Sequence, residues 1–239
     1  MPELTYDLHI HSCLSPCGDG DMTPYNIAAM SALKGLDVIA LTDHNSAKNC
    51  PALLEAAQGL GVMALPGLEV CTAEEVHAVC LFAQLDAAMA FDAFIYDRLI
   101  KIPNKPEVFG AQLICRADDT VVGEEPHLLI NAAEVPFDEL WDLALSYGGV
   151  MFPAHIERTS NSLLSNLGFI PPASKFRTAE LKDIHALHTL MAAHPYLQGC
   201  HIISNSDAHY LEHIREPGLT IPAKDRTPEA VIAWLRGEY

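Results

Sequence analysis

The feature that most constrains the fold is an alternation of short apolar runs with longer stretches of helical pattern. The apolar runs have the length expected of strands and cover residues 4–10, 37–41, 62–66, 76–82, 149–153 and 200–204. Helical patterns cover residues 24–34, 52–58, 87–100, 137–147, 181–193 and 228–237. Thr23 and Pro24 form a clear helix start at the first of these. The alternation predicts an α/β fold.

Length and composition favour one globular domain over residues 1–239. Half of the 239 residues are hydrophobic, so the chain can bury a sizeable core, and we find no internal repeat or low-complexity linker. Residues 101–126 break the alternation, because they hold three prolines and a polar turn at Asp118 and Asp119. We expect an inserted loop or small hairpin there, which either shapes the substrate pocket or is a surface excursion without a role.

Charge and cysteine content limit the expected partners and compartment. The chain has 14 basic and 31 acidic residues, which gives a net charge of −17. Because phosphate contacts need clustered Lys and Arg, we expect no long duplex nucleic acid as a partner. The acidity serves either solubility or a cation site. Seven cysteines, an odd number, and no basic-then-apolar leader indicate a reduced, cytoplasmic protein. No apolar run reaches transmembrane length, so we expect no membrane partner.

Side chains that bind metals occur at the ends of several predicted strands. They are His9, His11, His44, Glu69, His155, Asp207 and His209. Residues two apart on a strand point to the same face, so His9 and His11 can reach one metal ion. The carboxyl ends of parallel strands meet on one face of a barrel, which brings the whole set together. Imidazole and carboxylate ligands suit Zn, Mn or Fe.

Six sequence blocks resemble the ordered motifs of the PHP (polymerase and histidinol phosphatase) superfamily. They are DLHIHS, DGDMTP, LTDHN, GLEV, PAHIER and NSDAH, and they run from residue 7 to residue 209. The resemblance implies a distorted (β/α)7 barrel with two or three divalent ions, Mn²⁺, Zn²⁺ or Fe²⁺. The ligands that it implies are His9, His11, Asp19, His44, Glu69, His77, His155, Asp207 and His209. A longer stretch than usual precedes Asp19, so Asp21 is the alternative ligand there.

The same resemblance implies hydrolysis of phosphate esters by a metal-activated hydroxide, because divalent ions lower the pKa of bound water. We expect a small phosphomonoester, a nucleotide or a short oligonucleotide as substrate. Arg158, three residues past His155, is either a phosphate clamp or a surface salt bridge. Asp43, beside His44, either orients a ligand histidine, relays a proton or caps the following helix.

Other interpretations of the same residues remain open. A non-catalytic metal- or nucleotide-binding accessory or sensing module is the alternative function, although a structural site needs only four ligands. Metal-dependent amide hydrolysis usually recruits a bridging Lys, and none lies at a predicted strand end. Cys13 and Cys17 have the spacing of a zinc finger but lack a second pair. His185 and His188 lie three apart in a predicted helix without a further ligand, so we expect both to be structural. The oligomeric state is left open.

Overall fold

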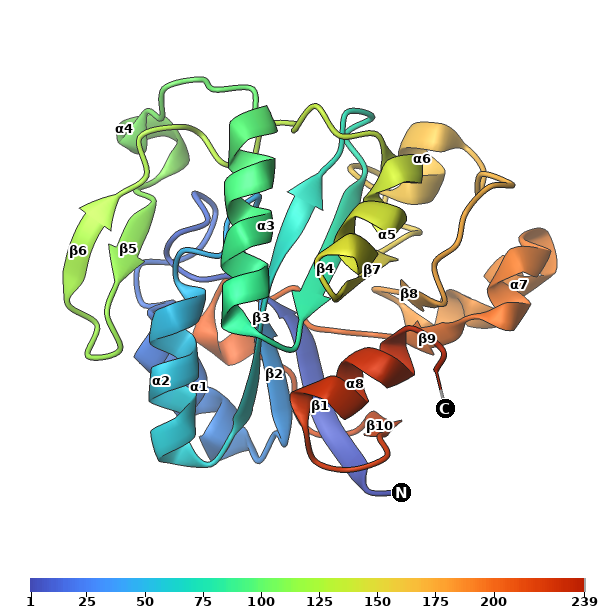
Figure 1. The fold of residues 1–239 in the computed structure, drawn as a ribbon, viewed down its shortest axis with the longest axis horizontal. Helices are drawn as coiled ribbons and strands as arrows, with labels where there is room; N and C mark the ends of the chain where they lie inside the picture. The colour runs from blue at the N-terminus through green and yellow to red at the C-terminus, as the bar shows by residue number, and fades with distance from the viewer. Residues whose placement is uncertain (239) are drawn as a thin grey trace.

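The computed structural model describes residues 1–238 and has a mixed α/β fold around a curled six-stranded sheet (Figure 1). The sheet has the order β10-β1-β2-β3-β4-β7. Its strands are β1 (Glu3–Ile10), β2 (Val38–Leu41), β3 (Met63–Cys71), β4 (His77–Phe82), β7 (Gly149–Pro153) and β10 (Thr220–Pro222). Two further strand pairs accompany it: β5 (Leu113–Cys115) with β6 (Val121–Glu124), and β8 (Thr178–Glu180) with β9 (His201–Ile203).

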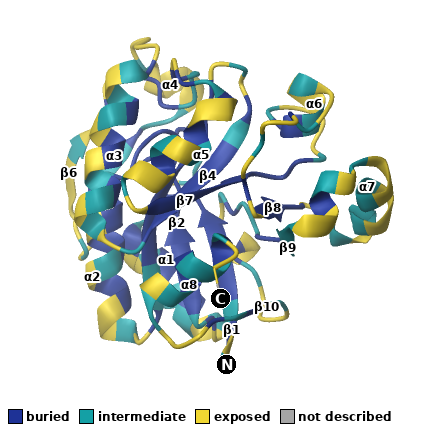
Figure 2. Ribbon diagram, turned by 45° about the vertical axis from the view of Figure 1, so that its right-hand side comes forward, coloured by how far each residue is buried: buried dark blue, intermediate teal, exposed yellow. Residues whose placement is uncertain are grey.

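Helices cover both faces of the sheet, and their outward sides are exposed while the central strands of the sheet are mostly buried (Figure 2). The outer face is packed by α1 (Pro24–Lys34), α2 (Cys50–Leu60), α3 (Leu85–Arg98) and α5 (Phe137–Ser146). The inner face is packed by α8 (Pro228–Leu235). Shorter helices are α4 (Pro106–Phe109), α6 (Leu163–Leu167), α7 (Leu187–Ala193), η1 (Ile184–Ala186), η2 (Pro195–Gly199) and η3 (Leu211–His213). Within residues 1–238, none of the helices has the length and apolar character needed to cross a membrane.

Helix α1 shows how local sequence sets the bounds of an element. The Thr23 side chain accepts a hydrogen bond from Asn26 N at 3.3 Å, and Pro24 supplies the fixed φ of a first helical position. Gly35 ends the helix with φ 78°, a left-handed conformation that glycine adopts without strain. The helix therefore has the predicted bounds.

The structure agrees only in part with the predicted (β/α)7 barrel, because its sheet is curled but not all of its strands are parallel. Strands β1, β2 and β3 are parallel, but β4 runs antiparallel to both β3 and β7. The connection of residues 72–76 is too short for a crossover helix, and it turns the chain straight back. After β7, Ile156 N donates a backbone hydrogen bond to Glu180 O at the end of β8. A β-bridge between Ile10 and Ala208 joins β1 to the segment after β9.

Residues 101–126 form α4 and the antiparallel β5–β6 hairpin, with Asp118 and Asp119 at its turn. Glu125 anchors the hairpin, because its carboxylate accepts a hydrogen bond from Tyr96 Oη at 2.7 Å and another from Lys48 Nζ. Lys48 lies in the loop after β2, so the hairpin is tied to the loop that carries His44. Whether this segment counts as an insertion in a single domain stays a prediction.

Side chains of the sheet alternate between two hydrophobic cores. On β2, Ile39 and Leu41 lie in the outer core, whereas Val38 and Ala40 lie in the inner core. Strand β1 departs from this alternation, because Leu8 lies in the inner core and Ile10 in the outer one. The register of β1 against β2 shifts between Asp7 and Ile10. An extra residue there reverses which side chains face inward, and so directs His9 and His11 to the inner face.

Candidate metal centre

The inner face of the sheet is apolar next to α8 and carries a buried polar cluster at the carboxyl end of β3. Glu69, on β3, is the centre of this cluster and is 1% exposed. Its carboxylate oxygens lie 3.0–3.5 Å from ring nitrogens of His9, His11, His44, His77 and His155. His77 is the first residue of β4, and because β4 is antiparallel to β3, the start of one strand lies at the end of the other.

Asp207 and His209 complete the cluster from the segment after β9. Asp207 Oδ1 lies 3.6 Å from His9 Nε2 and 3.4 Å from His11 Nε2. The His209 ring stacks on the His11 ring with centroids 4.3 Å apart. The structure therefore brings together every ligand that the family resemblance implies except Asp19.

The cluster fits divalent metal ions. His9 Nε2 and His11 Nε2 lie 3.1 Å apart, close to the roughly 3–3.4 Å between two nitrogens on one ion with bonds of about 2.1 Å. Three groups of ligand atoms, each within 4.8 Å of one another, share members of the cluster. They are His11, His44 and His209; His9, His11 and Glu69; and His44, Glu69 and His77.

Unpaired buried atoms point to the same conclusion. His44 Nδ1, Glu69 Oε2 and His155 Nδ1 are buried and have no hydrogen-bond partner among residues 1–238. His44 Nδ1 and Glu69 Oε2 lie 3.0 Å apart but without the angles of a hydrogen bond. Buried polar atoms are nearly always paired in proteins, and a cation would satisfy these.

The charged groups of the cluster shift one another's pKa values. Burial alone would raise the pKa of Glu69, but the surrounding His77 and His9 hold that pKa well below its usual range. Burial would lower the pKa of His9, but the carboxylates of Glu180, Glu69 and Asp207 hold it well above its usual range. Burial and the neighbouring imidazoles keep the pKa of His11 well below its usual range.

Two residues of the cluster and one beside it have a left-handed backbone conformation. His155 has φ 29° and Asp207 has φ 53°, values that residues other than glycine seldom adopt. Asn45, directly after His44, has φ 48°. Its side chain holds this conformation by donating to Leu129 O at 2.7 Å and accepting from Cys71 N at 3.0 Å. Such strain is typical of functional sites, where the surrounding structure fixes the geometry.

Glu180, on β8, contacts the cluster and is absent from the residues that the sequence predicts for it. Its fully buried carboxylate accepts a hydrogen bond from His9 Nδ1 at 2.9 Å. It also accepts from His155 N at 3.2 Å and from Asn205 Nδ2 at 2.8 Å. The contact leaves His9 Nε2 free to face the cluster. The segment FRTAEL mixes apolar and polar residues and β8 has only three residues, so the sequence predicts no strand there. The helix predicted from residue 181 is wrong at its start, because the helical turns begin only at Ile184.

Asp43 contacts the cluster through Ser15. Its carboxylate accepts hydrogen bonds from Ser12 Oγ and Ser15 Oγ, both at 2.7 Å. Ser15 Oγ lies 2.9 Å from His11 Nδ1. Burial raises the pKa of Asp43 and the serine hydrogen bonds oppose it. The N-cap residue of α2 is Asn49, so this geometry favours the orienting role for Asp43 over the capping one.

Arg158 and Asp19 each contact one residue of the cluster, whereas Asp21 contacts Asp19. Arg158 Nη1 donates to Asp207 Oδ2 at 2.8 Å, and its side chain is 45% exposed. Asp19 N donates to His209 O at 2.9 Å, but the Asp19 carboxylate accepts a hydrogen bond from Asp21 N. Asp21 is exposed. Among residues 1–238, neither carboxylate forms an ion pair with a histidine of the cluster, so the choice between Asp19 and Asp21 stays open.

The remaining histidine and cysteine candidates lie elsewhere. His185 and His188 are exposed, and neither belongs to a potential metal-binding group in the described part of the chain. Cys13 Sγ lies 3.7 Å from Cys115 Sγ rather than pairing with Cys17, which is exposed. All seven cysteines are free. The cytoplasmic location stays a prediction.

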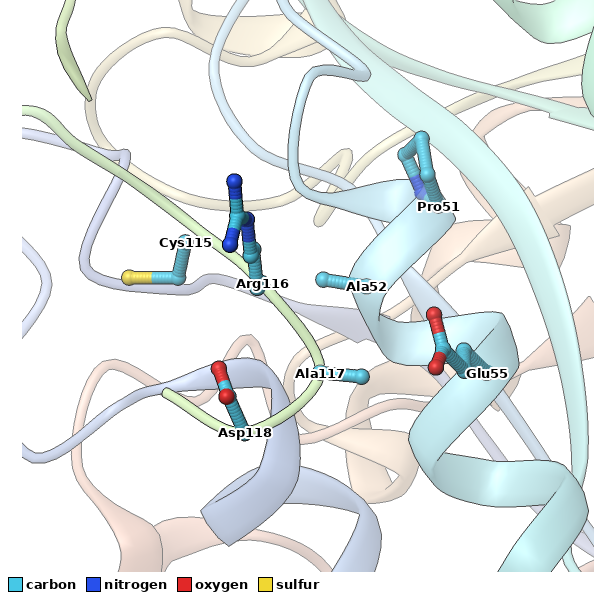
Figure 3. Close-up of a pocket in the computed structure, with 7 residues that line it drawn as sticks. All are labelled: Pro51, Ala52, Glu55, Cys115, Arg116, Ala117 and Asp118. Carbon is cyan, nitrogen blue, oxygen red and sulfur yellow. The ribbon is translucent and has the colours of Figure 1, made fainter. Parts of the chain in front are cut away.

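One pocket adjoins the cluster, and a separate one adjoins the end of β5. The first, of about 430 Å³, opens onto the cluster and is lined in part by Asp207 and His209. The second, of about 400 Å³, lies where the segment after β5 faces the first turns of α2 (Figure 3). It is lined by Pro51, Ala52, Glu55, Cys115, Arg116, Ala117 and Asp118, and shares no residue with the cluster.

Comparison with known families decides the identity of the fold. The family model of the PHP domain matches residues 7–215. The chain belongs to the PHP family. The six sequence blocks from DLHIHS to NSDAH all lie within the residues that the PHP model matches, and so do the residues of the cluster around Glu69.

Individual relatives share parts of this PHP chain. The 5′-3′ exoribonuclease Rnm of Salmonella typhimurium (strain LT2) is 33% identical over 76 residues, which is 31% of this chain and 25% of that protein. The crystal structure of the lesion-specific endonuclease PfuEndoQ from Pyrococcus furiosus has a TM-score of 0.66 and 19% identity. It covers 99% of this chain, which spans 56% of that chain. At this identity the likeness shows the fold alone.

A second endonuclease Q structure overturns the expectation that long duplex nucleic acid is excluded. It contains a 27-mer duplex substrate with an abasic lesion at the active site, with a TM-score of 0.64, 18% identity and coverage of 99% of this chain and 57% of that chain. A protein with a similar fold therefore binds duplex DNA, and a long duplex is not excluded as a partner of this chain. Net charge was the wrong criterion, because binding depends on the local charge around the site rather than on the sum over the chain.

Proposed function

We propose that this PHP chain hydrolyses phosphate esters at a centre of two or three divalent ions, Mn²⁺, Zn²⁺ or Fe²⁺. The observation that carries the proposal is the Glu69 carboxylate within 3.5 Å of five histidine side chains on the inner face of the sheet. Three overlapping groups of ligand atoms support more than one ion. Bound divalent ions supply a Lewis acid for phosphoryl oxygens and lower the pKa of coordinated water.

Residues around the ligands fix their orientation. The His9 Nδ1–H group donates to Glu180, and His11 Nδ1 contacts Ser15, which in turn donates to Asp43. Both imidazoles therefore present Nε2 to the same point. Fixed tautomers keep the ligands ready for metal, so little reorganisation is needed on binding.

Cationic side chains at the mouth of the cluster suit an anionic substrate. Arg158 and Lys182 line the pocket that opens onto Asp207 and His209. A guanidinium can donate two parallel hydrogen bonds to phosphate oxygens. We therefore assign Arg158 to substrate phosphate binding, with its contact to Asp207 exchanged for the phosphate when substrate binds.

The proposed substrates are nucleotide esters. The similarity to an exoribonuclease and to endonuclease Q supports esters of nucleotides, from mononucleotides to oligonucleotides. The pocket of about 430 Å³ is large enough for a small-molecule ligand of the usual size. Duplex DNA is a substrate class to be tested beside these.

The test is a panel of phosphate esters assayed with Mn²⁺, Zn²⁺, Fe²⁺ and Mg²⁺. The panel contains a mononucleotide, a trinucleotide, a long single strand, a DNA duplex and a non-nucleotide ester. We expect metal-dependent hydrolysis by the wild type, a loss of several orders of magnitude for His9→Ala, and little change for His185→Ala. Absence of hydrolysis of every ester by metal-loaded wild type, or full activity of His9→Ala, would contradict the proposal. Nucleotide binding without turnover would support the accessory-module alternative.

A further inference from the structure

An exposed aromatic side chain lies at the mouth of the cluster. Tyr210 directly follows His209 in the chain and is 46% exposed, although large aromatic side chains are usually well buried. It lines the pocket of about 430 Å³ together with Asp207 and His209. An aromatic ring exposed beside a cluster of metal-ligand type is a candidate for substrate contact.

His213 contacts both the backbone and the ring of Tyr210. The Tyr210 backbone follows His209, whose ring is stacked on His11 within the cluster. On the other side, Tyr210 O accepts a hydrogen bond from His213 N at 3.0 Å at the start of η3. The His213 ring meets the Tyr210 ring edge to face, with centroids 5.3 Å apart and planes at 70°. A ring held in this way loses little conformational freedom when a ligand stacks on it.

Cationic groups share the pocket with this aromatic pair. Arg158 and Lys182 line the same cavity, and Arg158 donates to Asp207 at 2.8 Å. The cavity thus combines the edge of the cluster, two cations and an exposed aromatic ring. The cations and the cluster suit the phosphate of a nucleotide, and the aromatic ring suits its flat base.

Resting on the phosphoesterase function proposed above, we propose that Tyr210, supported by His213, stacks on the nucleobase of a nucleotide substrate. The phosphate of that nucleotide lies at the cluster, beside Arg158 and Lys182. Tyr210 is therefore a specificity residue that distinguishes nucleotides from other phosphate esters. Stacking tolerates every base, because each base has a π-face, so the proposal predicts preference for a base without preference for its identity.

The experiment compares two non-hydrolysable ligands, the methylene phosphonate analogues of adenosine 5′-monophosphate and of ribose 5-phosphate, because the proposed activity would consume the parent esters. The first ligand carries a base and the second carries a hydroxyl in its place. Dissociation constants are measured by calorimetry on the Mn²⁺-loaded full chain. We expect wild type to bind the nucleotide analogue more tightly, and Tyr210→Ala to reduce the ratio of the two affinities by roughly five- to a hundredfold. Tyr210→Phe keeps the aromatic face and should keep the ratio. Tyr25→Ala is the matched control, because Tyr25 is 45% exposed on α1 and does not line this pocket.

The outcomes separate this inference from the phosphoesterase proposal. Equal wild-type affinities for the two ligands, or an unchanged ratio in Tyr210→Ala, would overturn the stacking role even if both parent esters are hydrolysed. A ratio that falls in Tyr210→Ala but not in Tyr210→Phe or Tyr25→Ala supports the stacking role, even if the wild type hydrolyses neither parent ester.

Discussion

Glu180 Oε2 lies 2.9 Å from His9 Nδ1, and both side chains are completely buried. The two residues are 171 positions apart in the sequence. Because the carboxylate accepts the Nδ1 proton, the other ring nitrogen of His9 faces Glu69 and His11. The orientation of a candidate metal ligand on β1 therefore depends on a strand near the other end of the chain.

The first prediction concerns this contact. Glu180→Gln keeps the shape of the side chain and a hydrogen-bond acceptor but removes the charge, so we expect metal affinity to fall by about ten- to a hundredfold. The measurement is a calorimetric titration of metal-free protein with Mn²⁺, with circular dichroism to check folding. Glu55→Gln is the control, because Glu55 is exposed on α2. Wild-type affinity in folded Glu180→Gln would show that the contact does not position His9 for metal.

Arg158 provides a prediction about substrate binding. Arg158→Ala should raise the KM of the preferred phosphate ester by roughly ten- to a hundredfold, through the loss of a charge-assisted contact of about 1.5–3 kcal/mol. The measurement is steady-state kinetics with the metal-loaded enzyme. Arg226→Ala is the control, since exposed Arg226 pairs with Asp37 and does not line the pocket. An unchanged KM in Arg158→Ala would assign this side chain to a surface salt bridge.

The anchor of the β5–β6 hairpin predicts a pH dependence of stability. Burial would raise the pKa of Glu125, but hydrogen bonds from Lys48 and Tyr96 hold it below its usual value. A lowered pKa contributes stability that is fully present above the unfolded value of about 4.3, and is lost as pH falls through the folded value. Glu125→Gln should therefore lower the free energy of unfolding by about 1.5–3 kcal/mol at pH 7 and by less below about pH 4.

Urea unfolding at pH 7 and pH 3.5 measures this difference for Glu125→Gln and for the neighbouring control Glu124→Gln, whose side chain is exposed. A loss of stability that is the same at both pH values would mean that packing, rather than the charge of Glu125, is responsible.

Local signals made part of the fold predictable. Helix α1 has the predicted bounds because Thr23, Pro24 and Gly35 determine its ends within a few residues. Strand β3 was predicted for residues 62–66 but continues to Cys71, because its second half pairs with β4, a contact that no local pattern reveals. Glu69 therefore lies within a strand rather than after one.

Some features of the site also follow from local sequence and others from long-range pairing. The spacing of His9 and His11 indicated that both face one side, and the structure places their Nε2 atoms 3.1 Å apart. The register shift that turns them inward is set by pairing between β1 and β2, so the sequence does not show it. Glu180 lay beyond prediction for a similar reason, since β8 is three residues long and is held by β9.

The central claim is that the histidine and carboxylate cluster around Glu69 holds more than one metal ion. Elemental analysis of protein purified with Mn²⁺, Zn²⁺ or Fe²⁺ present measures it directly, as the number of ions per chain. The overlapping groups of ligand atoms predict two or three ions, and fewer in His9→Ala, whereas His185→Ala should retain the wild-type number. At most one ion per chain in the wild type under metal-replete conditions would contradict the account.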